Sequence, residues 1–382
     1  MARPRTVELD LDALLADRSK RIIVCCGSGG VGKTTTAAAL GLRAADQGRR
    51  VVVLTIDPAL RLAQSLGLTA LDNTPRPVSG VDPANGGSLD AMMLDMKRTF
   101  DEVVEAHASP EKAAQILANP FYVAVSSSFA GTQEYMAMEK LGQLRAQSEA
   151  DGRWDLIVVD TPPSRSALDF LDAPKRLGSF LDGRLIRVLM APAKAGGKAY
   201  VKAVGATMTM AMGVMTKVLG GDLLRDVQTF VAAMDTMFGG FRERADQTYA
   251  LLKDQETAFV VVAAPERDAL REAAFFTDRL VREAMPLAGV VVNRVQNVAG
   301  ALSRVRAEDA AEVLESGSPK SSASAGLLRL HAELSANAER HQAHIARFAT
   351  SHPGVALTQV PAAARDIHDI NGLRSVGAAL AD

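Results

Sequence analysis

The pattern of hydrophobic and polar positions predicts strands and helices in alternation along this chain. Short, nearly continuous apolar runs recur between longer segments of mixed polarity. They lie at 21–26, 50–57, 154–160, 258–263, 288–293 and 355–360. Such runs are typical of strands that are buried on both faces of a parallel sheet. The order predicts an α/β fold with a doubly wound, mostly parallel sheet.

The segments between the apolar runs predict helices and loops. Helical spacing or helix-start signals indicate helices within 35–47, 91–150, 266–285 and 327–350. Residues that favour turns indicate surface loops at 73–88 and 316–324. We therefore expect one domain over 1–382, with helical elaborations at 97–150 and 165–256.

The composition indicates a soluble globular protein, with 48% hydrophobic and 23% charged residues and a net charge of −1. This balance gives no general attraction to nucleic acid, so no such partner is expected. Residues 1–20 lack the apolar core of a signal peptide, and the apolar stretch 203–216 is too short to span a membrane. We expect a cytoplasmic protein that reaches a membrane only through a partner.

A glycine-rich segment between the first apolar run and the first predicted helix has the pattern of a phosphate-binding loop. It fits G-x-x-x-x-G-K-[ST] and consists of Gly27, Ser28, Gly29, Gly30, Val31, Gly32, Lys33 and Thr34. In such a loop, backbone amides and the helix N-terminus surround phosphate oxygens, the lysine adds a positive charge, and the hydroxyl can ligate Mg²⁺. Together with Thr35, this P-loop predicts binding of a nucleoside triphosphate.

Two aspartates at the ends of other apolar runs are expected to complete the site. The carboxyl ends of parallel strands meet at one edge of a sheet, so Asp57 and Asp160 can lie beside Lys33. We expect Thr34 and Asp160 to hold Mg²⁺, the aspartate through water. Asp57 is either a turn residue or the acceptor that orients an attacking water.

In several motifs the chain resembles a known family. The P-loop, T-I-D-P-A at 55–59, D-T-P-P-S-R-S-A-L-D-F-L at 160–171 and V-V-N-R at 291–294 are similar to the ArsA and tail-anchored-protein-targeting ATPases. These are P-loop ATPases of the SIMIBI class with a deviant Walker A motif. The order of the motifs is most similar to that of actinobacterial ArsA-like ATPases.

The resemblance implies roles for individual residues. Asp57 would be the switch I residue that activates water, and Lys33 would contact the phosphates. Asn293 and the backbone after Pro361 would contact adenine. Switch II would comprise Asp160, Thr161, Pro162, Pro163 and Arg165. The resemblance also implies hydrolysis of ATP to ADP and phosphate, with Mg²⁺, by a dimer.

The chain departs from the family at Ser28, where the deviant motif has a lysine that contacts the phosphates of the other subunit. A short, uncharged serine cannot replace that lysine. Three explanations remain open. The chain pairs with a lysine-bearing paralogue, Arg165 supplies the missing cation, or the chain is a weakly active homodimer.

The cysteines of metal-binding relatives are also missing. Only Cys25 and Cys26 occur, adjacent to each other within the strand that precedes the P-loop. Neighbouring strand residues point to opposite faces, and the chain has no C-x-x-C motif. We therefore expect buried thiols, no zinc and no iron–sulfur cluster, and arsenite is an unlikely effector for the same reason.

The second helical elaboration is rich in methionine. Seven of the 14 methionines lie within 190–237, and Met208, Met212 and Met215 share one helix face. This face is either a buried packing stripe or an adaptable groove for a hydrophobic helix. In the tail-anchor ATPases, the groove for a client helix occupies this position, which favours the second interpretation.

Four functions are compatible with these features. The first is a dimeric ATPase switch that handles a hydrophobic client or a membrane partner. The second is the energy-coupling ATPase subunit of an anion transporter, and the third is a positioning ATPase of the ParA or MinD kind. The last is a weakly active nucleotide-binding subunit of a heterodimer. The third needs a basic DNA-binding face or an amphipathic C-terminal membrane helix, and the segment 374–380 is too short and too weakly charged for such a helix. The missing cysteines remove the best-known anion of the second. We favour the first.

Overall fold

The structure is a computed structural model that describes residues 7–56, 61–120, 122–123, 132–162, 243–315 and 319–381. The chain divides into two compact units. The first comprises Met1–Met93, Asp151–Ala167 and Leu252–Asp382, and the second comprises Leu94–Ala150 and Leu168–Leu251.

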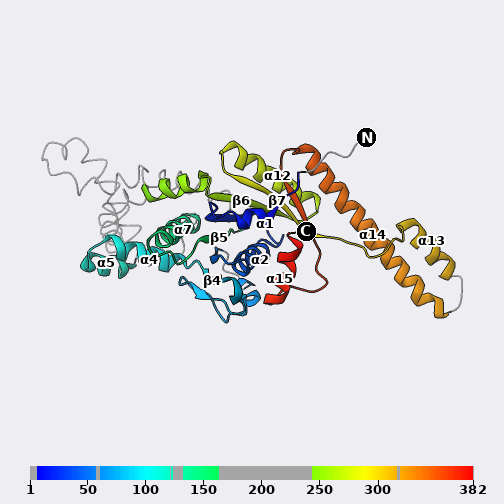
Figure 1. The fold of residues 1–382 in the computed structure, drawn as a ribbon, viewed down its shortest axis with the longest axis horizontal. Coiled ribbons are helices and arrows are strands. Elements are labelled where there is room, and N and C mark those ends of the chain that lie inside the picture. The colour runs from blue at the N-terminus through cyan, green and yellow to red at the C-terminus, as the bar shows by residue number, and fades with distance from the viewer. Residues whose placement is uncertain are drawn as a thin grey trace, which may run out of the picture. The chain divides into compact units, whose positions relative to one another are not determined.

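An eight-stranded sheet forms the centre of the first unit, in the order β3-β4-β2-β5-β1-β6-β7-β8 (Figure 1). Its strands are β1 Ile22–Cys26, β2 Arg50–Thr55, β3 Arg76–Pro77, β4 Ser88–Met93, β5 Leu156–Asp160, β6 Thr257–Ala263, β7 Leu287–Val295 and β8 Leu357–Pro361. Every neighbouring pair is parallel except β3 with β4. The predicted α/β fold with a mostly parallel sheet is confirmed.

Helices connect these strands in the first unit. They are α1 Leu11–Ala16, α2 Lys33–Asp46, α3 Arg61–Ser65, the 3₁₀ turn η1 Pro83–Asn85, α12 Arg267–Arg282, α13 Arg304–Glu315, α14 Pro319–Ser351 and α15 Ile370–Ala379. The helix after the P-loop, α2, packs closely on the sheet because its buried residues include several alanines and a glycine. A Cβ added to Gly41 would lie 2.5 Å from Cγ2 of Val53 on β2. This close packing brings the start of α2 to the carboxyl edge of the sheet.

The described part of the second unit is helical. It contains α4 Met96–His107, α5 Pro110–Leu117, most of α7 Thr132–Asp151 and helical residues at 243–251. The buried carboxylate of Glu139 on α7 accepts two hydrogen bonds from Nε of Arg244, each 3.0 Å long. Of the elaboration expected at 165–256, only 243–256 lies within the described residues, so Met208, Met212 and Met215 lie outside them.

One predicted loop and one predicted helical region contain a strand instead. Within the loop expected at 73–88 and the helices expected from 91, the structure has β4, which pairs in parallel with β2. The sequence pattern did not predict this strand, because an acidic residue, Asp90, lies at its centre. Asp90 is buried only because its carboxylate accepts hydrogen bonds from Trp154 Nε1 and from Arg153, each at 2.9 Å.

The serine-rich segment at 316–324 was also predicted wrongly, since residues 319–324 are helical and belong to the 33-residue helix α14. Proline suits the first turn of a helix, and Pro319 begins this one. The buried alanines Ala307 and Ala311 of α13 and Ala325 and Ala332 of α14 allow the two helices to pack as a hairpin (Figure 1). This packing stabilises helix where local propensity is weak.

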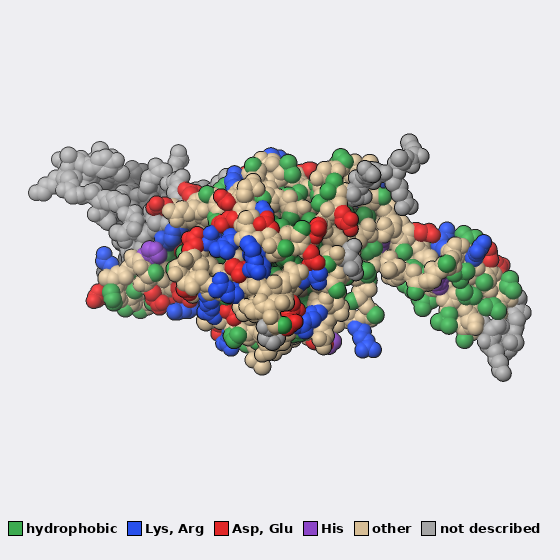
Figure 2. Space-filling view, in the orientation of Figure 1, with side chains coloured by type: hydrophobic (Ala, Val, Ile, Leu, Met, Phe, Trp, Pro, Cys, Tyr) green, Lys and Arg blue, Asp and Glu red, His purple; other side chains and the backbone are tan. Residues whose placement is uncertain are grey.

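The hairpin of α13 and α14 also exposes apolar side chains. Val305, Val313, Leu327 and Leu330 are each at least half exposed, and hydrophobic side chains are visible over this hairpin in Figure 2. Among the described residues, no helix is both long enough and apolar enough to cross a membrane.

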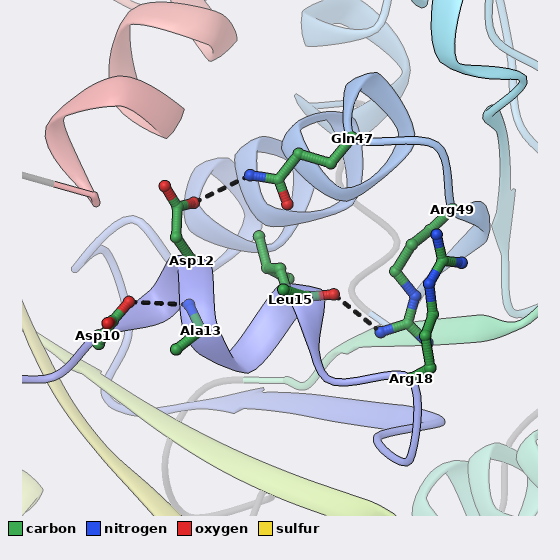
Figure 3. A pocket seen from close by; sticks show the side chains of 8 residues that line it. Asp10, Asp12, Ala13, Leu15, Arg18, Gln47 and Arg49 are labelled. Carbon is green, nitrogen blue, oxygen red and sulfur yellow. Dashed lines mark hydrogen bonds between the residues drawn. The ribbon is translucent and has the colours of Figure 1, made fainter.

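A cavity of about 570 Å³ beside α1 and the end of α2 has a structural role (Figure 3). Arg49, 1% exposed, donates to the carbonyl of Leu15 and pairs with Asp155 through Nε at 2.8 Å. Asp12 accepts from Arg43 and from Gln47. Because these charged groups already bind one another, they join α1, α2 and the starts of β2 and β5 rather than form a ligand site.

Candidate nucleotide-binding site

The P-loop follows β1 and turns directly into α2. Its first glycine, Gly27, lies against β6, where an added Cβ would be 2.0 Å from the carbonyl oxygen of Val262. Gly32 has a φ of 94° and is the N-cap of α2. A side chain would prevent the first approach and strain the second conformation, so both positions require glycine.

The P-loop lysine lies folded over its own loop. Lys33 is 7% exposed, and its Nζ donates to the carbonyl oxygen of Ser28 at 2.8 Å. The ammonium group is therefore next to the N-terminus of α2, whose backbone amides and dipole favour an anion. This arrangement suits the phosphates of a nucleotide.

Three elements converge on Asp160 at the end of β5. Its Oδ2 accepts hydrogen bonds from Thr34 Oγ1 of α2 at 2.7 Å and from Thr55 Oγ1 of β2 at 2.9 Å, and the residue is fully buried. Because Thr34 donates its only hydroxyl proton to Asp160, its oxygen lone pairs remain available to a cation. Hydroxyl and carboxylate oxygens are the ligands that Mg²⁺ prefers, so this group of side chains fits a magnesium ion bound with a phosphate.

A pocket of about 730 Å³ extends from the P-loop to the segment that follows β8, which is within the usual range for a small-molecule site. Its P-loop side includes Gly30, Gly32, Lys33, Thr34 and Thr35. Its far side includes Asn293, Arg294, Pro361, Arg365, Asp366 and His368. Five of the residues predicted to bind the nucleotide at the P-loop therefore line the same pocket as Asn293 and Pro361, the residues predicted to lie at the base.

The comparison with protein families agrees with this site. The profile of the anion-transporting ATPases matches residues 20–299, which include the P-loop, Asp160 and Asn293. This chain belongs to that family. The match ends before the hairpin of α13 and α14 and before Pro361.

Individual relatives match different shares of this chain. The arsenical pump-driving ATPase of Acidiphilium multivorum is 30% identical over 41% of this chain and 26% of its own length. ATPase GET3 of Candida glabrata is 26% identical over 46% of this chain and 52% of its own length. ATPase GET3B of Arabidopsis thaliana is 23% identical over 77% of this chain and 69% of its own length. The chain thus spans about a quarter of the length of the first of these relatives and about half the length of the second.

Ser28, the second residue of the P-loop, stands where the resemblance implies a lysine. It is 9% exposed, and its buried Oγ has no hydrogen-bond partner among the residues that the structure describes. Ser28 lines a second cavity, of about 370 Å³, together with Glu266, Asp268 and Glu272. Arg294 lines the same cavity, so this part of the P-loop is bordered by three acidic side chains and one guanidinium group.

The two cysteines are buried in β1, as expected from the sequence. Burial raises the pKa of Cys26 to about 12. Burial, together with the nearby carboxylate of Asp160, raises the pKa of Cys25 as well. Both groups therefore remain thiols at neutral pH, and soft metals bind thiolates. Among the described residues, no group of three or more His, Cys, Asp or Glu side chains could hold a metal ion.

Several predicted site residues cannot be placed. Asp57 of switch I and Pro163 and Arg165 of switch II lie outside the described residues, whereas Thr161 and Pro162 follow β5 directly. Thr161 Oγ1 donates to the carbonyl oxygen of Cys25 at 3.0 Å, which ties the start of switch II to β1.

The structure also shows residues at the site and in the pocket that the sequence did not predict. Thr55 lies within the T-I-D-P-A motif, but the motif did not indicate its hydrogen bond to Asp160. Gln64 and Ser65 of α3, and Arg365, Asp366 and His368 after β8, line the pocket without a local motif. The sequence feature that could have indicated Arg365, Asp366 and His368 is their place in a charged segment directly after the last strand.

Proposed function

We propose that this chain hydrolyses ATP with Mg²⁺ and acts as a dimeric switch of the ArsA type in the cytoplasm. The observation that supports it best is the junction at Asp160. There, the P-loop hydroxyl of Thr34 and the β2 hydroxyl of Thr55 bind one carboxylate at the carboxyl edge of the sheet. Nucleotide-hydrolysing P-loop proteins hold a metal at such a junction.

Each residue has a defined task in this proposal. Lys33 and the amides of the P-loop would bind the phosphates, and Thr34 and Asp160 would hold Mg²⁺, the aspartate through water. Mg²⁺ held there would supply positive charge beside the phosphates. Asp57 orients the attacking water, and Asn293 and the backbone after Pro361 border the space for the base. The reaction transfers the terminal phosphoryl group to water and yields ADP and phosphate.

Asp57→Asn tests the hydrolytic step. The amide keeps the size and polarity of the side chain but loses the charged acceptor that orients water, so we expect turnover to fall about 100-fold. Nucleotide affinity should stay within about threefold of the wild type, because Asp57 acts on water rather than on the ground-state phosphates. Phosphate release and calorimetric binding of ATP measure the two quantities.

Asp72→Asn is the matched control, because this exposed aspartate pairs with Arg76 and does not line the pocket. Its turnover should equal that of the wild type. Unchanged turnover of Asp57→Asn in an active preparation would reject the role of Asp57. A wild-type protein without Mg²⁺-dependent ATP hydrolysis would reject the function itself.

The proposed client is a hydrophobic helix or a membrane protein, by analogy with the relatives named GET3. If Met208, Met212 and Met215 form a client groove, replacing all three with Ser should abolish capture of a hydrophobic helix and spare basal ATP hydrolysis. Measuring thermal unfolding together with capture of the helix distinguishes a client groove from core packing. A loss of tens of degrees in the melting temperature would identify the methionines as core packing instead.

A second candidate function is the energy-coupling subunit of an anion transporter. The name of the family and the relative named arsenical pump-driving ATPase favour it. The raised pKa of the thiol of Cys26 argues against arsenite as that anion. Proteins that co-purify with the chain in ATP but not in ADP would distinguish a transporter from a helical client.

A further inference from the structure

Exposed hydrophobic side chains of the described residues are concentrated on the hairpin of α13 and α14 (Figure 2). Nine large hydrophobic side chains are exposed among the described residues, and five of them belong to this hairpin or directly precede it. These five are Leu302, Val305, Val313, Leu327 and Leu330. Single exposed hydrophobic residues are ordinary on soluble proteins, whereas a cluster indicates an interaction surface.

Helix α14 has two apolar faces. Its buried alanines Ala325 and Ala332 belong to the face that packs on α13. Leu327, Leu330 and Leu334 follow the spacing i, i+3 and i+7, and the helical period places them on the side away from those alanines. Leu327 is 69% and Leu330 50% exposed, and Leu334 is half-buried.

Together with an exposed alanine one turn earlier, these leucines form the outer stripe of α14. The outer stripe consists of Ala323, Leu327, Leu330 and Leu334. At 1.5 Å per residue, it is about 17 Å long. A face of this kind is suited to packing against another helix.

The surroundings of the outer stripe are nearly uncharged. Between residues 321 and 338 the only charged side chains are Arg329 and Glu333, and Arg329 is ion-paired with Glu315 of α13. Helices that bind anionic membranes carry a row of Lys and Arg beside the apolar face, and this segment has no such row. A partner that brings neutral apolar surface therefore fits this face best.

The outer stripe is complementary to itself when two copies of α14 lie antiparallel. Leu327 of one copy then packs against Leu330 of the other, and Ala323 packs against Leu334. Two leucine pairs form the centre of the contact, and a small side chain faces a large one at each end. Glu333 lies level with Ser324 of the other copy, so no like charges oppose each other.

We propose that the outer stripe of α14 is a contact between two copies of this chain, which pair antiparallel through it. Because both copies supply the same residues, the contact is symmetric and closes as a pair. It is short, so we expect a Kd of about 10 µM rather than a permanent dimer. No residue of the outer stripe lines the nucleotide pocket, so this contact goes beyond the proposed function and requires no nucleotide.

Sedimentation equilibrium of the full chain without nucleotide measures the contact. Leu327→Glu places a carboxylate from each copy in the apolar centre, so its Kd should be at least about 100-fold higher than that of the wild type. Val281→Glu is the matched control, because Val281 is 63% exposed on α12 and lies outside the hairpin. Its Kd should equal that of the wild type. Both side chains are exposed in the single chain, so circular dichroism should show unchanged folding of both variants.

Disulfide trapping tests the antiparallel arrangement. The native cysteines are buried, so introduced cysteines supply the reactive thiols. A mixture of Leu327→Cys and Leu330→Cys should form an intermolecular disulfide about tenfold faster than either variant alone. In the antiparallel pair, position 327 lies opposite position 330 of the other copy, whereas two equivalent positions are too far apart for a disulfide.

Three results would overturn the inference. One is a wild-type chain that stays monomeric at about ten times the expected Kd. Another is association that Leu327→Glu leaves unchanged, which would place the interface elsewhere. The third is faster disulfide formation in each single variant than in the mixture, which would indicate parallel helices. A monomeric chain that binds a neutral Leu–Ala helical peptide or phospholipid vesicles through Leu327 would assign the outer stripe to a client helix or a membrane instead.

Discussion

Lys33→Ala should weaken ATP binding by at least about 100-fold. Lys33 is 7% exposed, and its ammonium group lies beside the N-terminus of α2, where it donates to Ser28 of the same loop. Removing one partner from a desolvated charge pair costs about 2–5 kcal/mol, and 2.7 kcal/mol corresponds to about 100-fold in Kd. Calorimetric titration with ATP and Mg²⁺ measures the effect.

Lys33→Met separates the charge from the packing of the side chain. Methionine keeps most of the length and loses the ammonium group, so it should lose as much affinity as alanine. In the ligand-free protein it should unfold at the same or a higher urea concentration, because a buried cation at a helix N-terminus is unfavourable without an anion. Near-normal ATP affinity in Lys33→Met would show that Lys33 does not contact the phosphates.

ATP hydrolysis by the isolated chain should be slow and should rise by about 10³-fold or more when a lysine-bearing paralogue is added. In the family the signature lysine contacts the other subunit's nucleotide, and a cation at the transferring phosphoryl group contributes about 10³–10⁵ in rate. Because this chain has Ser28 there, a heterodimer would be asymmetric. The site with Lys33 and Asp160 would receive the paralogue's lysine.

Two variants test this asymmetry by phosphate release. Asp57→Asn in this chain should remove more of the complex's activity than the equivalent change in the paralogue. Ser28→Lys should raise the activity of the isolated chain, since each subunit of a homodimer then supplies the missing cation. Rapid, partner-independent turnover that Ser28→Lys does not increase would reject the heterodimer and favour Arg165 as the substitute cation.

Much of the fold follows from the sequence alone. The apolar runs that became β1, β2, β5, β6, β7 and β8 have one dominant driving force, burial on both faces of a parallel sheet, so local pattern was sufficient. The P-loop was equally clear, because its function depends on a few neighbouring residues. Glycines allow the backbone conformation, and lysine and threonine at fixed spacing provide a charge and a hydroxyl group. The family followed from these short motifs and their order.

The contacts between distant segments were decided by the tertiary structure. The strand β4 depends on Asp90, whose burial requires Trp154 and Arg153 from another part of the chain. The helix at 319–324 depends on packing against α13. In both places, long-range packing outweighs local propensity.

The same distinction holds within the candidate site. The sequence predicted Thr34 and Asp160 as site residues, but only the structure shows that the hydroxyls of Thr34 and Thr55 bind one carboxylate oxygen of Asp160. Asn293 was recognisable by its motif. Its hydrogen bond to Val31 arises from a bulge between β7 and β8. Strand register and the direction of a side chain at a bulge depend on how neighbouring strands pair, which no single segment of sequence determines.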